Sequence, residues 1–179
     1  MRTRTSIFVL AAASVLAAAC ASPTPGGGPP ADGDGVVTHV VDGDTLDVRI
    51  GGTEERIRLI GVDTPESVAP NRPVQCYGAE ASAYLASLVP EGTAVRLERD
   101  AVARDQFGRL LAYVYRAEDD LLVNLALVEQ GYADAVTYGD NEALYPELVA
   151  AEAEARDGGR GLWGVCGGPD VDIGPPPDR

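Results

Sequence analysis

The sequence predicts an α+β fold, mainly β, in which a five-stranded barrel of the OB type is capped by about three helices. Two observations lead to this fold class. From residue 36 onward, short apolar blocks are separated by turn signals, a pattern typical of successive strands in a small barrel. Three segments with helical spacing accompany them, one after the third strand and two after the fifth. A chain of 179 residues, 45% of them hydrophobic, can bury one ordinary core, so we expect one domain.

The first three strands are predicted as a meander. They cover residues 36–41, 46–50 and 55–62. In the third of them, Arg56 and Arg58 alternate with apolar residues. Because side chains alternate between the two faces of a strand, both arginines are expected on the face opposite the core, where Arg58 can point into a cleft.

The remaining elements follow in order along the chain. An alanine-rich helix is predicted over residues 79–88, strands over 94–99 and 110–115, and helices over 122–130 and 146–156. The last helix has Pro146 in its first turn and glycines after its end, which are the usual start and stop signals. These elements complete the barrel and its cap.

The N-terminus is typical of an exported lipoprotein. Arg2 and Arg4 precede an apolar run over residues 7–19, which is too short to span a bilayer but suits a signal peptide. Small residues then precede Cys20, the expected lipidation site and membrane anchor of a cell-surface or periplasmic lipoprotein. The alternative is cleavage after Ala19 or Ala21 and secretion of a soluble protein. The expected organisation is therefore a signal peptide over 1–19, a flexible linker over 20–35, the barrel domain over 36–166 and a disordered tail over 167–179.

Two cysteines remain after Cys20. In an exported protein a remaining pair is more often a disulfide than a metal site, so we expect a Cys76–Cys166 bond. In the chain-entropy model, closing such a long loop contributes up to about 4 to 5 kcal/mol. The alternative is two isolated thiols.

The strongly acidic charge disfavours nonspecific binding to nucleic acid. The formal net charge is −14, and removal of Arg2 and Arg4 with the signal peptide lowers it to −16. Every basic side chain is arginine, which binds phosphate through two parallel hydrogen bonds and keeps its charge. For a nucleic-acid ligand, we would therefore expect weak overall affinity with strong local contacts. Adaptation to high salt can also produce such an acidic charge, and a single sequence does not decide whether it does so here.

Several short blocks stand out along the predicted domain: Asp42-Gly43-Asp44-Thr45, Arg58 through Glu66, Tyr77-Gly78 with Glu80-Ala81-Ser82, and Phe107-Gly108-Arg109. Taken together and in this order, they resemble the staphylococcal nuclease (thermonuclease) family, as a bacterial exported homologue. The resemblance covers residues 36–164. Such an order is specific, although each block alone is a common turn or a solvated strand.

The resemblance implies a role for each site residue. Asp44, Asp63 and the backbone carbonyl of Thr64 would hold Ca²⁺, since carboxylate and carbonyl oxygens are its preferred ligands. Arg58 and Arg109 would bind the phosphate. Glu66 would act as general base or orient the attacking water.

The function implied is a calcium-dependent endonuclease that hydrolyses phosphodiester bonds of single- or double-stranded DNA and RNA and leaves 3′-phosphate ends. A monomer is expected. One alternative is a non-catalytic OB-fold module that binds nucleic acid or protein. Another is an acidic Ca²⁺-binding surface lipoprotein, which leaves both site arginines without a purpose.

The chain also departs from the family's pattern. Gln106 and Phe107 stand where relatives commonly carry a basic residue and a tyrosine, so a charge and a hydroxyl are lost. Val136 replaces another tyrosine. Tyr138 remains a candidate for stacking on a base, with packing as its alternative role. The sequence therefore does not identify which residues would contact the phosphate on the 3′ side.

Overall fold

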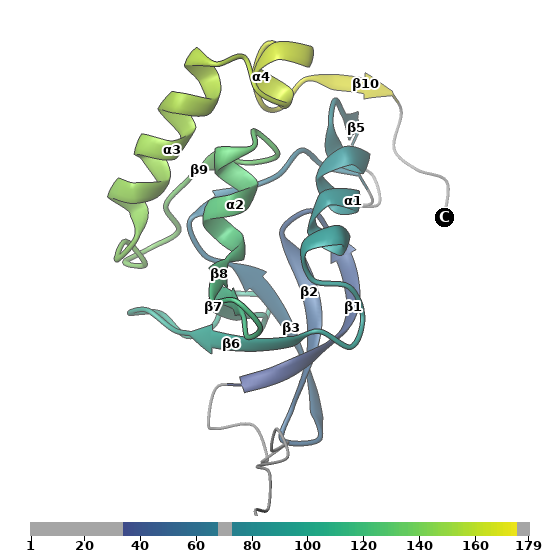
Figure 1. Cartoon of the computed structure of the whole chain (residues 1–179), viewed down its shortest axis with the longest axis vertical. Coiled ribbons are helices and arrows are strands. Elements are labelled where there is room, and N and C mark those ends of the chain that lie inside the picture. The colour runs from purple at the N-terminus through teal and green to yellow at the C-terminus, as the bar shows by residue number, and fades with distance from the viewer. Residues whose placement is uncertain (1–33, 68–72, 175–179) are drawn as a thin grey trace, which may run out of the picture.

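Five strands close into a barrel in the computed structural model, which describes residues 34–67 and 73–174 (Figure 1). They are β1 (Asp34–Asp42), β2 (Thr45–Ile50), β3 (Thr53–Leu59), β6 (Ala94–Glu98) and β7 (Leu110–Arg116). The sheet runs in the order β3-β2-β1-β6-β7, and β7 returns to pair in parallel with β3. The predicted five-stranded barrel is thus confirmed.

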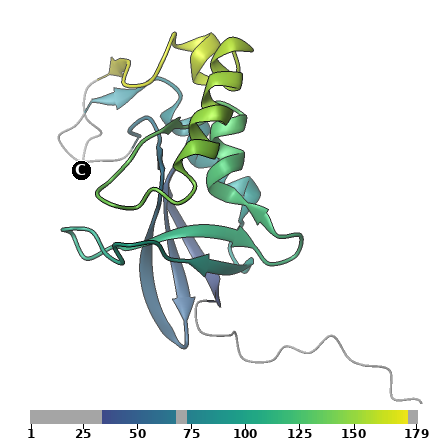
Figure 2. The same cartoon turned by 90° about the vertical axis from the view of Figure 1, so that its left-hand side faces the viewer.

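Four helices lie together above one end of the barrel (Figure 2). They are α1 (Gly78–Leu88), α2 (Val123–Glu129), α3 (Tyr145–Asp157) and the short α4 (Leu162–Val165). Pro146 stands in the first turn of α3, where its missing N–H is not needed. The first three helices match the predicted segments to within two residues, and α4 is an additional turn.

The core forms where the barrel meets these helices. Leu46, Ile57 and Leu59 from the strands are fully buried against Leu85 of α1 and Leu127 of α2. Burying each such side chain contributes about 1.5 to 3 kcal/mol. The rigid barrel end that results carries the polar residues described below.

Five short strands connect the barrel to its cap. They are β4 (Val62–Asp63), β5 (Val74–Gln75), β8 (Leu121–Leu122), β9 (Asp134–Ala135) and β10 (Asp172–Gly174). β4 pairs with β9 and β5 pairs with β10, both antiparallel, while β8 extends the barrel sheet beside β7.

Gly61 makes the tight turn between β3 and β4. Its φ is 81°, and a Cβ added there would lie 2.3 Å from Cδ1 of Leu148 in α3. Any other residue would be strained by the backbone and would clash with α3. The turn brings Arg58 and Asp63, at the ends of the two strands, to the same place.

The Cys76–Cys166 disulfide is present, with its Cα atoms 6.0 Å apart, which confirms that prediction. The bond joins the segment before α1 to the end of α4 across a sequence separation of 90 residues.

The predicted domain boundaries need correction at both ends. β1 begins at Asp34, inside the expected linker. The expectation of a disordered tail is wrong for residues 167–174, because β10 pairs with β5 and Cys76 N donates to Val171 O at 2.7 Å. The pairing of β5 with β10 and the nearby disulfide order this segment. Neither feature produces a hydrophobic pattern that could be recognised in the sequence.

The predicted signal peptide, Cys20 and the rest of the linker and tail lie outside the described residues. No helix among the residues described is long and apolar enough to cross a membrane.

Candidate active site

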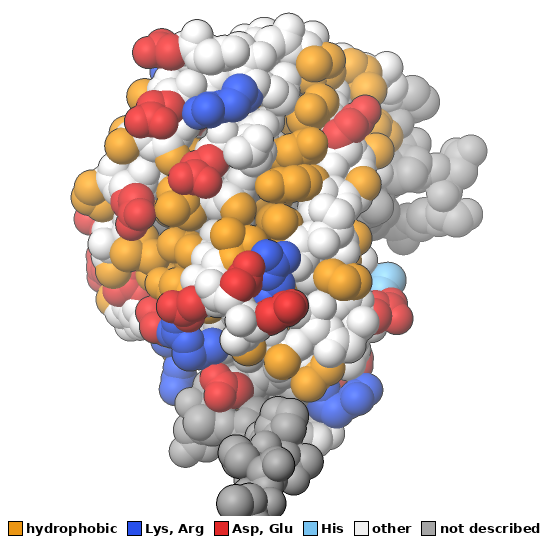
Figure 3. Space-filling model, viewed as in Figure 1, with side chains coloured by type: hydrophobic (Ala, Val, Ile, Leu, Met, Phe, Trp, Pro, Cys, Tyr) orange, Lys and Arg blue, Asp and Glu red, His pale blue; other side chains and the backbone are white. Residues whose placement is uncertain are grey.

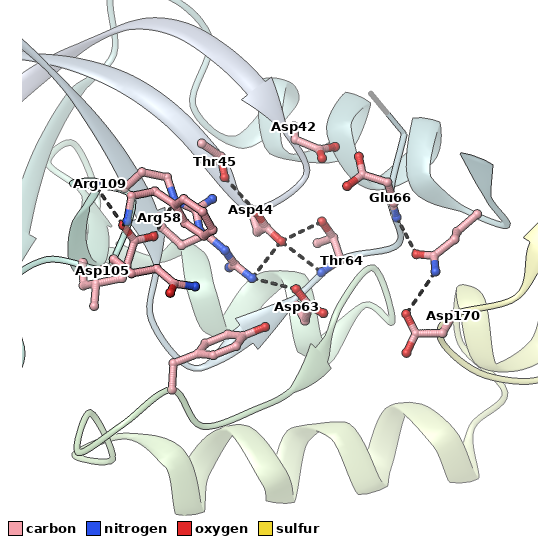
Figure 4. Close-up of a pocket in the computed structure, with 15 residues that line it drawn as sticks. Asp42, Asp44, Thr45, Arg58, Asp63, Thr64, Glu66, Asp105, Arg109 and Asp170 are labelled. Carbon is pink, nitrogen blue, oxygen red and sulfur yellow. Dashed lines mark hydrogen bonds and ion pairs between the residues drawn. The ribbon is translucent and has the colours of Figure 1, made fainter. Parts of the chain in front are cut away.

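A pocket of about 420 Å³ opens where β2 begins and β3 ends (Figure 4). Every residue assigned a catalytic, metal-binding or substrate-binding role from the sequence lines it. These residues are Asp44, Arg58, Asp63, Thr64, Glu66, Arg109 and Tyr138. Segments far apart in the chain thus converge on one cavity.

Asp44 lines the pocket and is only 7% exposed. Thr45 Oγ1 donates to its Oδ1 at 2.9 Å, while the backbone N and the Oγ1 of Thr64 both donate to its Oδ2 at 3.1 Å. The antiparallel pairing of Thr45 with Arg58 places Asp44, the residue just before β2, beside the end of β3, where Leu59 N donates to Asp44 O at 3.0 Å. Asp44 is therefore held in one orientation.

Arg58 is buried between the two predicted metal ligands. Its Nη2 lies 2.6 Å from Asp63 Oδ1 and 3.2 Å from Asp44 Oδ2. Its Nη1 donates to the carbonyls of Leu59 at 3.1 Å and Val62 at 2.7 Å. The guanidinium faces the carboxylates, as the functional hypothesis requires, but it is enclosed rather than open to solvent.

Arg109 reaches the same pocket from the turn before β7. Its Nε donates to Asp105 Oδ2 at 2.6 Å. Asp105 Oδ1 also accepts from the backbone N of Phe107 and of Arg109, both at 2.9 Å. Burial raises the pKa of Asp105, but the bonds from Arg109 outweigh it and the pKa is lowered. Asp105 therefore fixes both the turn and the guanidinium.

Glu66 lines the pocket beyond Thr64. Its backbone N donates to Gln75 Oε1 at 2.7 Å, and Gln75 Nε2 donates to Asp170 Oδ1 at 3.2 Å (Figure 4). Gln75 and Asp170 also line the pocket.

Negative charge dominates the pocket lining. Six carboxylates, from Asp42, Asp44, Asp63, Glu66, Asp105 and Asp170, face two guanidinium groups. Burial raises the pKa of Asp42 and of Asp63 above the ordinary value of 3.8. Asp134, which pairs with Asp63 across β4 and β9, has its pKa raised to about 7 by burial and by the charge of Asp63. A bound cation would relieve this repulsion.

The donor set fits a hard divalent cation. Asp44 and Asp63 place carboxylate oxygens within reach of one nitrogen of Arg58, so they converge on a cation position. Within the described part of the chain, no three His, Cys, Asp or Glu side chains form a metal-binding group. A metal would thus need other oxygen ligands, such as the Thr64 carbonyl and water, as Ca²⁺ commonly takes.

Aromatic residues stand at the edge of the pocket. Tyr138 is 46% exposed, and its ring centroid lies 5.3 Å from Cζ of Arg58. Phe107 is 75% exposed at the tip of the turn, with its ring 5.6 Å from Cζ of Arg109. Val136 is absent from the residues that line the pocket.

Sequence analysis missed four carboxylate and amide residues of the site. Asp42 stands inside a quoted motif and Asp105 just before another, and their position near a predicted ligand and a predicted catalytic arginine could have identified them. Gln75 and Asp170 carry no local signal, because they meet only through the pairing of β5 with β10.

Comparison with known proteins identifies relatives of this chain. A family described as Staphylococcal nuclease homologue matches residues 56–165. The chain is 40% identical over 128 residues to a thermonuclease of Staphylococcus intermedius, covering 72% of this chain and 74% of that protein. It is 39% identical over 127 residues to a thermonuclease of Staphylococcus hyicus, covering 71% and 73%. It is 38% identical over 131 residues to the endonuclease YncB of Bacillus subtilis (strain 168), covering 72% of this chain and 61% of that protein.

Proposed function

Because the chain belongs to the staphylococcal nuclease family, we propose that it is a nuclease that hydrolyses phosphodiester bonds of DNA and RNA. One observation carries the proposal. Two guanidinium groups and the two carboxylates of a cation site line a single pocket with Glu66. Relatives named thermonuclease and endonuclease support the same activity. A purely binding module has no need of this complete set.

We propose Ca²⁺ as the cation, held by Asp44, Asp63 and the Thr64 carbonyl. Its support is chemical: the ligands are all oxygen, and no histidine or cysteine lines the pocket. Bound there, the cation supplies positive charge to a phosphoryl oxygen.

The protein's own groups account for the remaining steps. Arg58 and Arg109 donate hydrogen bonds to the non-bridging oxygens, which carry more charge in the transition state than in the substrate. Glu66 accepts a proton from the attacking water as the new P–O bond forms. The bond from phosphorus to the 5′ oxygen breaks, and that oxygen leaves with a proton from solvent. The phosphate remains on the 3′ side, so 3′-phosphate ends are expected.

Glu66→Gln tests the mechanism. The amide has the shape of the carboxylate but cannot accept the proton, so kcat should fall at least about 100-fold, in the range that general acid–base catalysis contributes. Cleavage of a fluorescent single-stranded oligonucleotide is the measurement, and circular dichroism checks the fold. Glu91→Gln, an exposed carboxylate outside the pocket, is the matched control. Unchanged turnover in Glu66→Gln would reject the role of Glu66.

Removal of the metal tests the cofactor. Chelation of Ca²⁺ should abolish cleavage by the wild-type chain, and added Ca²⁺ should restore it. Restoration by Mg²⁺ alone would reject Ca²⁺ as the working ion. Product ends are identified by mass spectrometry, which separates a 3′-phosphate from a 3′-hydroxyl.

We also propose that the protein is exported as a monomeric lipoprotein anchored through Cys20. The disulfide supports an oxidising compartment, since such bonds are rare in the cytosol. Mass spectrometry of the mature N-terminus distinguishes a lipidated Cys20 from cleavage after Ala19 or Ala21 and secretion.

A further inference from the structure

Residues 166–174, here called the C-terminal strap, reach the candidate active site from beyond the last helix. Cys166 anchors the strap to Cys76 through the disulfide. Farther along, Val171 O accepts from Cys76 N at 2.7 Å, and Asp172 pairs with Gln75 where β10 lies against β5. One covalent bond and a short antiparallel ladder therefore hold the strap in place.

Gln75, at the centre of this ladder, holds Glu66 from two sides. Its backbone N donates to Glu66 O at 2.8 Å, and its side-chain Oε1 accepts from Glu66 N at 2.7 Å. Both backbone polar groups of Glu66 are thus bonded to one residue. Gln75 is only 8% exposed, so little solvent competes for these bonds.

Asp170 of the strap fixes the orientation of the Gln75 amide. Gln75 Nε2 donates to Asp170 Oδ1 at 3.2 Å. A carboxylate only accepts hydrogen bonds, so the amide nitrogen must face Asp170 and the amide oxygen must face Glu66. Asp170 has a φ of 59°, a left-handed conformation that is uncommon for a residue other than glycine. The strap holds it there between the disulfide and β10.

We propose that Gln75 and Asp170 are positioning residues for Glu66, and that the disulfide-anchored strap makes catalysis depend on the Cys76–Cys166 bond. The inference rests on the proposed function, because it assumes that Glu66 acts on the attacking water. A displacement of about 1 Å in a catalytic group can lower the rate by about 100-fold. The strap contributes no predicted metal ligand and neither arginine, so its release should lower kcat and leave KM nearly unchanged.

Gln75→Met tests the first contact. Methionine has a similar length but offers no strong acceptor to the Glu66 N–H, so kcat should fall about 10- to 100-fold with KM changed less than about threefold. Asp172→Asn is the matched control, because Asp172 is exposed and meets Gln75 through the backbone ladder. An unchanged kcat in Gln75→Met would overturn the proposal.

Reversing the donor and acceptor between residues 75 and 170 distinguishes a positioning role from a general loss of stability. Gln75→Glu keeps an acceptor for Glu66 N but sets a second carboxylate against Asp170, so kcat should fall. Adding Asp170→Asn restores a donor and acceptor pair with the roles reversed, and kcat should recover at least about tenfold. A double variant no faster than Gln75→Glu alone would contradict the proposed contact.

The disulfide is tested in the full chain. Reduction, or Cys76→Ser with Cys166→Ser, should lower kcat about tenfold at a temperature where the protein stays folded, with KM nearly constant. A reduced protein that cleaves as fast as the oxidised one would overturn the role of the strap.

Hydrogen exchange at the Glu66 amide, measured by NMR, tests the same contact without depending on catalysis. Protection of this amide should be lost in Gln75→Met and on reduction. A wild-type chain that fails to cut rejects the proposed function, whereas unchanged exchange rejects the positioning itself.

Discussion

In the proposed mechanism, Arg58 competes with a cation for the carboxylates of the pocket. Its Nη2 contacts both Asp63 and Asp44, the two predicted Ca²⁺ ligands. In the interior of a protein, opposite charges at such distances interact by several kcal/mol. The same residue therefore stabilises the two carboxylates and, in the proposed mechanism, the phosphate.

Arg58→Met should separate these two effects. Without the guanidinium, Asp44 and Asp63 lose a competing positive charge, so Ca²⁺ affinity should rise about tenfold or more, equivalent to about 1.4 kcal/mol. Cleavage should fall because a phosphate contact is gone. Isothermal titration calorimetry with Ca²⁺ is the measurement. Weaker Ca²⁺ binding than in the wild type would show that the cation binds elsewhere.

Phe107 is a large apolar residue held in solvent by a rigid turn. Asp105 accepts two backbone hydrogen bonds within that turn, and Arg104 Nη1 donates to Gly108 O at 2.8 Å. A ring fixed beside Arg109 is suited to stack on a base, and base stacking contributes about 1 to 3 kcal/mol. Phe107→Ala should therefore raise KM for single-stranded DNA at least about fivefold. Phe107→Tyr keeps the ring and should stay near the wild type; equal KM values for all three would exclude stacking.

Asp100 gives a prediction about pH. Hydrogen bonds from the backbone N of Ala143 and of Ala101 lower its pKa from 3.8, against a smaller opposing effect of burial. A carboxyl with a lowered pKa in the folded state stabilises the protein above the unfolded value, and that stability is lost as pH falls through the folded pKa. Because Asp100 is partly exposed, the contribution is at most about 1 kcal/mol. Asp100→Asn should be less stable than wild type at pH 7, and urea unfolding curves of the two should converge at acidic pH below 3.8. A constant difference across pH would contradict this.

At the scale of elements, one segment delivers much of the site. β3 carries Arg58, Gly61 turns the chain, and β4 carries Asp63. The pairing of β3 with both β2 and β7 then sets this segment between Asp44 and Arg109. A closed barrel fixes both neighbours at once, which explains how residues from three separate motifs meet.

Asn124 ties α2 to this part of the barrel. It is fully buried; its Nδ2 donates to Ile60 O at 2.7 Å, and its Oδ1 accepts from Val114 N at 2.9 Å. Removing the side chain leaves two buried backbone groups unpaired, at about 1 to 3 kcal/mol each. Asn124→Ala should therefore lower the free energy of unfolding by at least about 2 kcal/mol in urea. Glu129→Ala, at an exposed position of the same helix, should change it by less than about 0.5 kcal/mol. A loss below 1 kcal/mol for Asn124→Ala would show that water replaces these bonds.

Elements with a local pattern could be predicted from the sequence, and contacts made through tertiary pairing could not. Alternating Arg58 and Ile57 indicated β3, and the helical spacing indicated α1 to α3. The motifs identified Asp44, Glu66 and Arg109 as candidates, and the barrel brings them together. Asp170 escaped detection because a Gly- and Pro-rich composition predicts disorder, whereas a disulfide and a backbone ladder order the strap. The burial of Arg58 was also not predicted. An alternating pattern indicates which face of a strand a side chain lies on, but not which other residues cover that face.

At the scale of the whole molecule, most arginines within residues 34–67 and 73–174 are already paired with acidic residues. Arg56 contacts Asp47, Arg104 contacts Glu55 and Arg116 contacts Asp119. On the helix-bearing face in Figure 3, acidic side chains are spread over the surface and the arginines lie beside them. Such pairing leaves little positive surface to attract nucleic acid at long range. Affinity must then come from the pocket, and the net charge of −14 opposes it.

The salt dependence of binding follows from this arrangement. Each phosphate contact contributes about −0.7 to the slope of log K against log salt concentration for a single strand, so Arg58 and Arg109 together give a slope no steeper than about −2. Screening of the molecule's own negative charge flattens the slope further. Fluorescence anisotropy of a single-stranded oligonucleotide with the Glu66→Gln chain, in Ca²⁺ and increasing NaCl, is the measurement. In that background Arg109→Ala should make the slope shallower by about 0.7, because one phosphate contact is lost, whereas Arg96→Ala should leave it unchanged, since Arg96 is paired with Glu98 and Asp120. A slope steeper than about −4 would mean that arginines outside the pocket also bind the backbone, and the acidic surface would then be no barrier to the substrate.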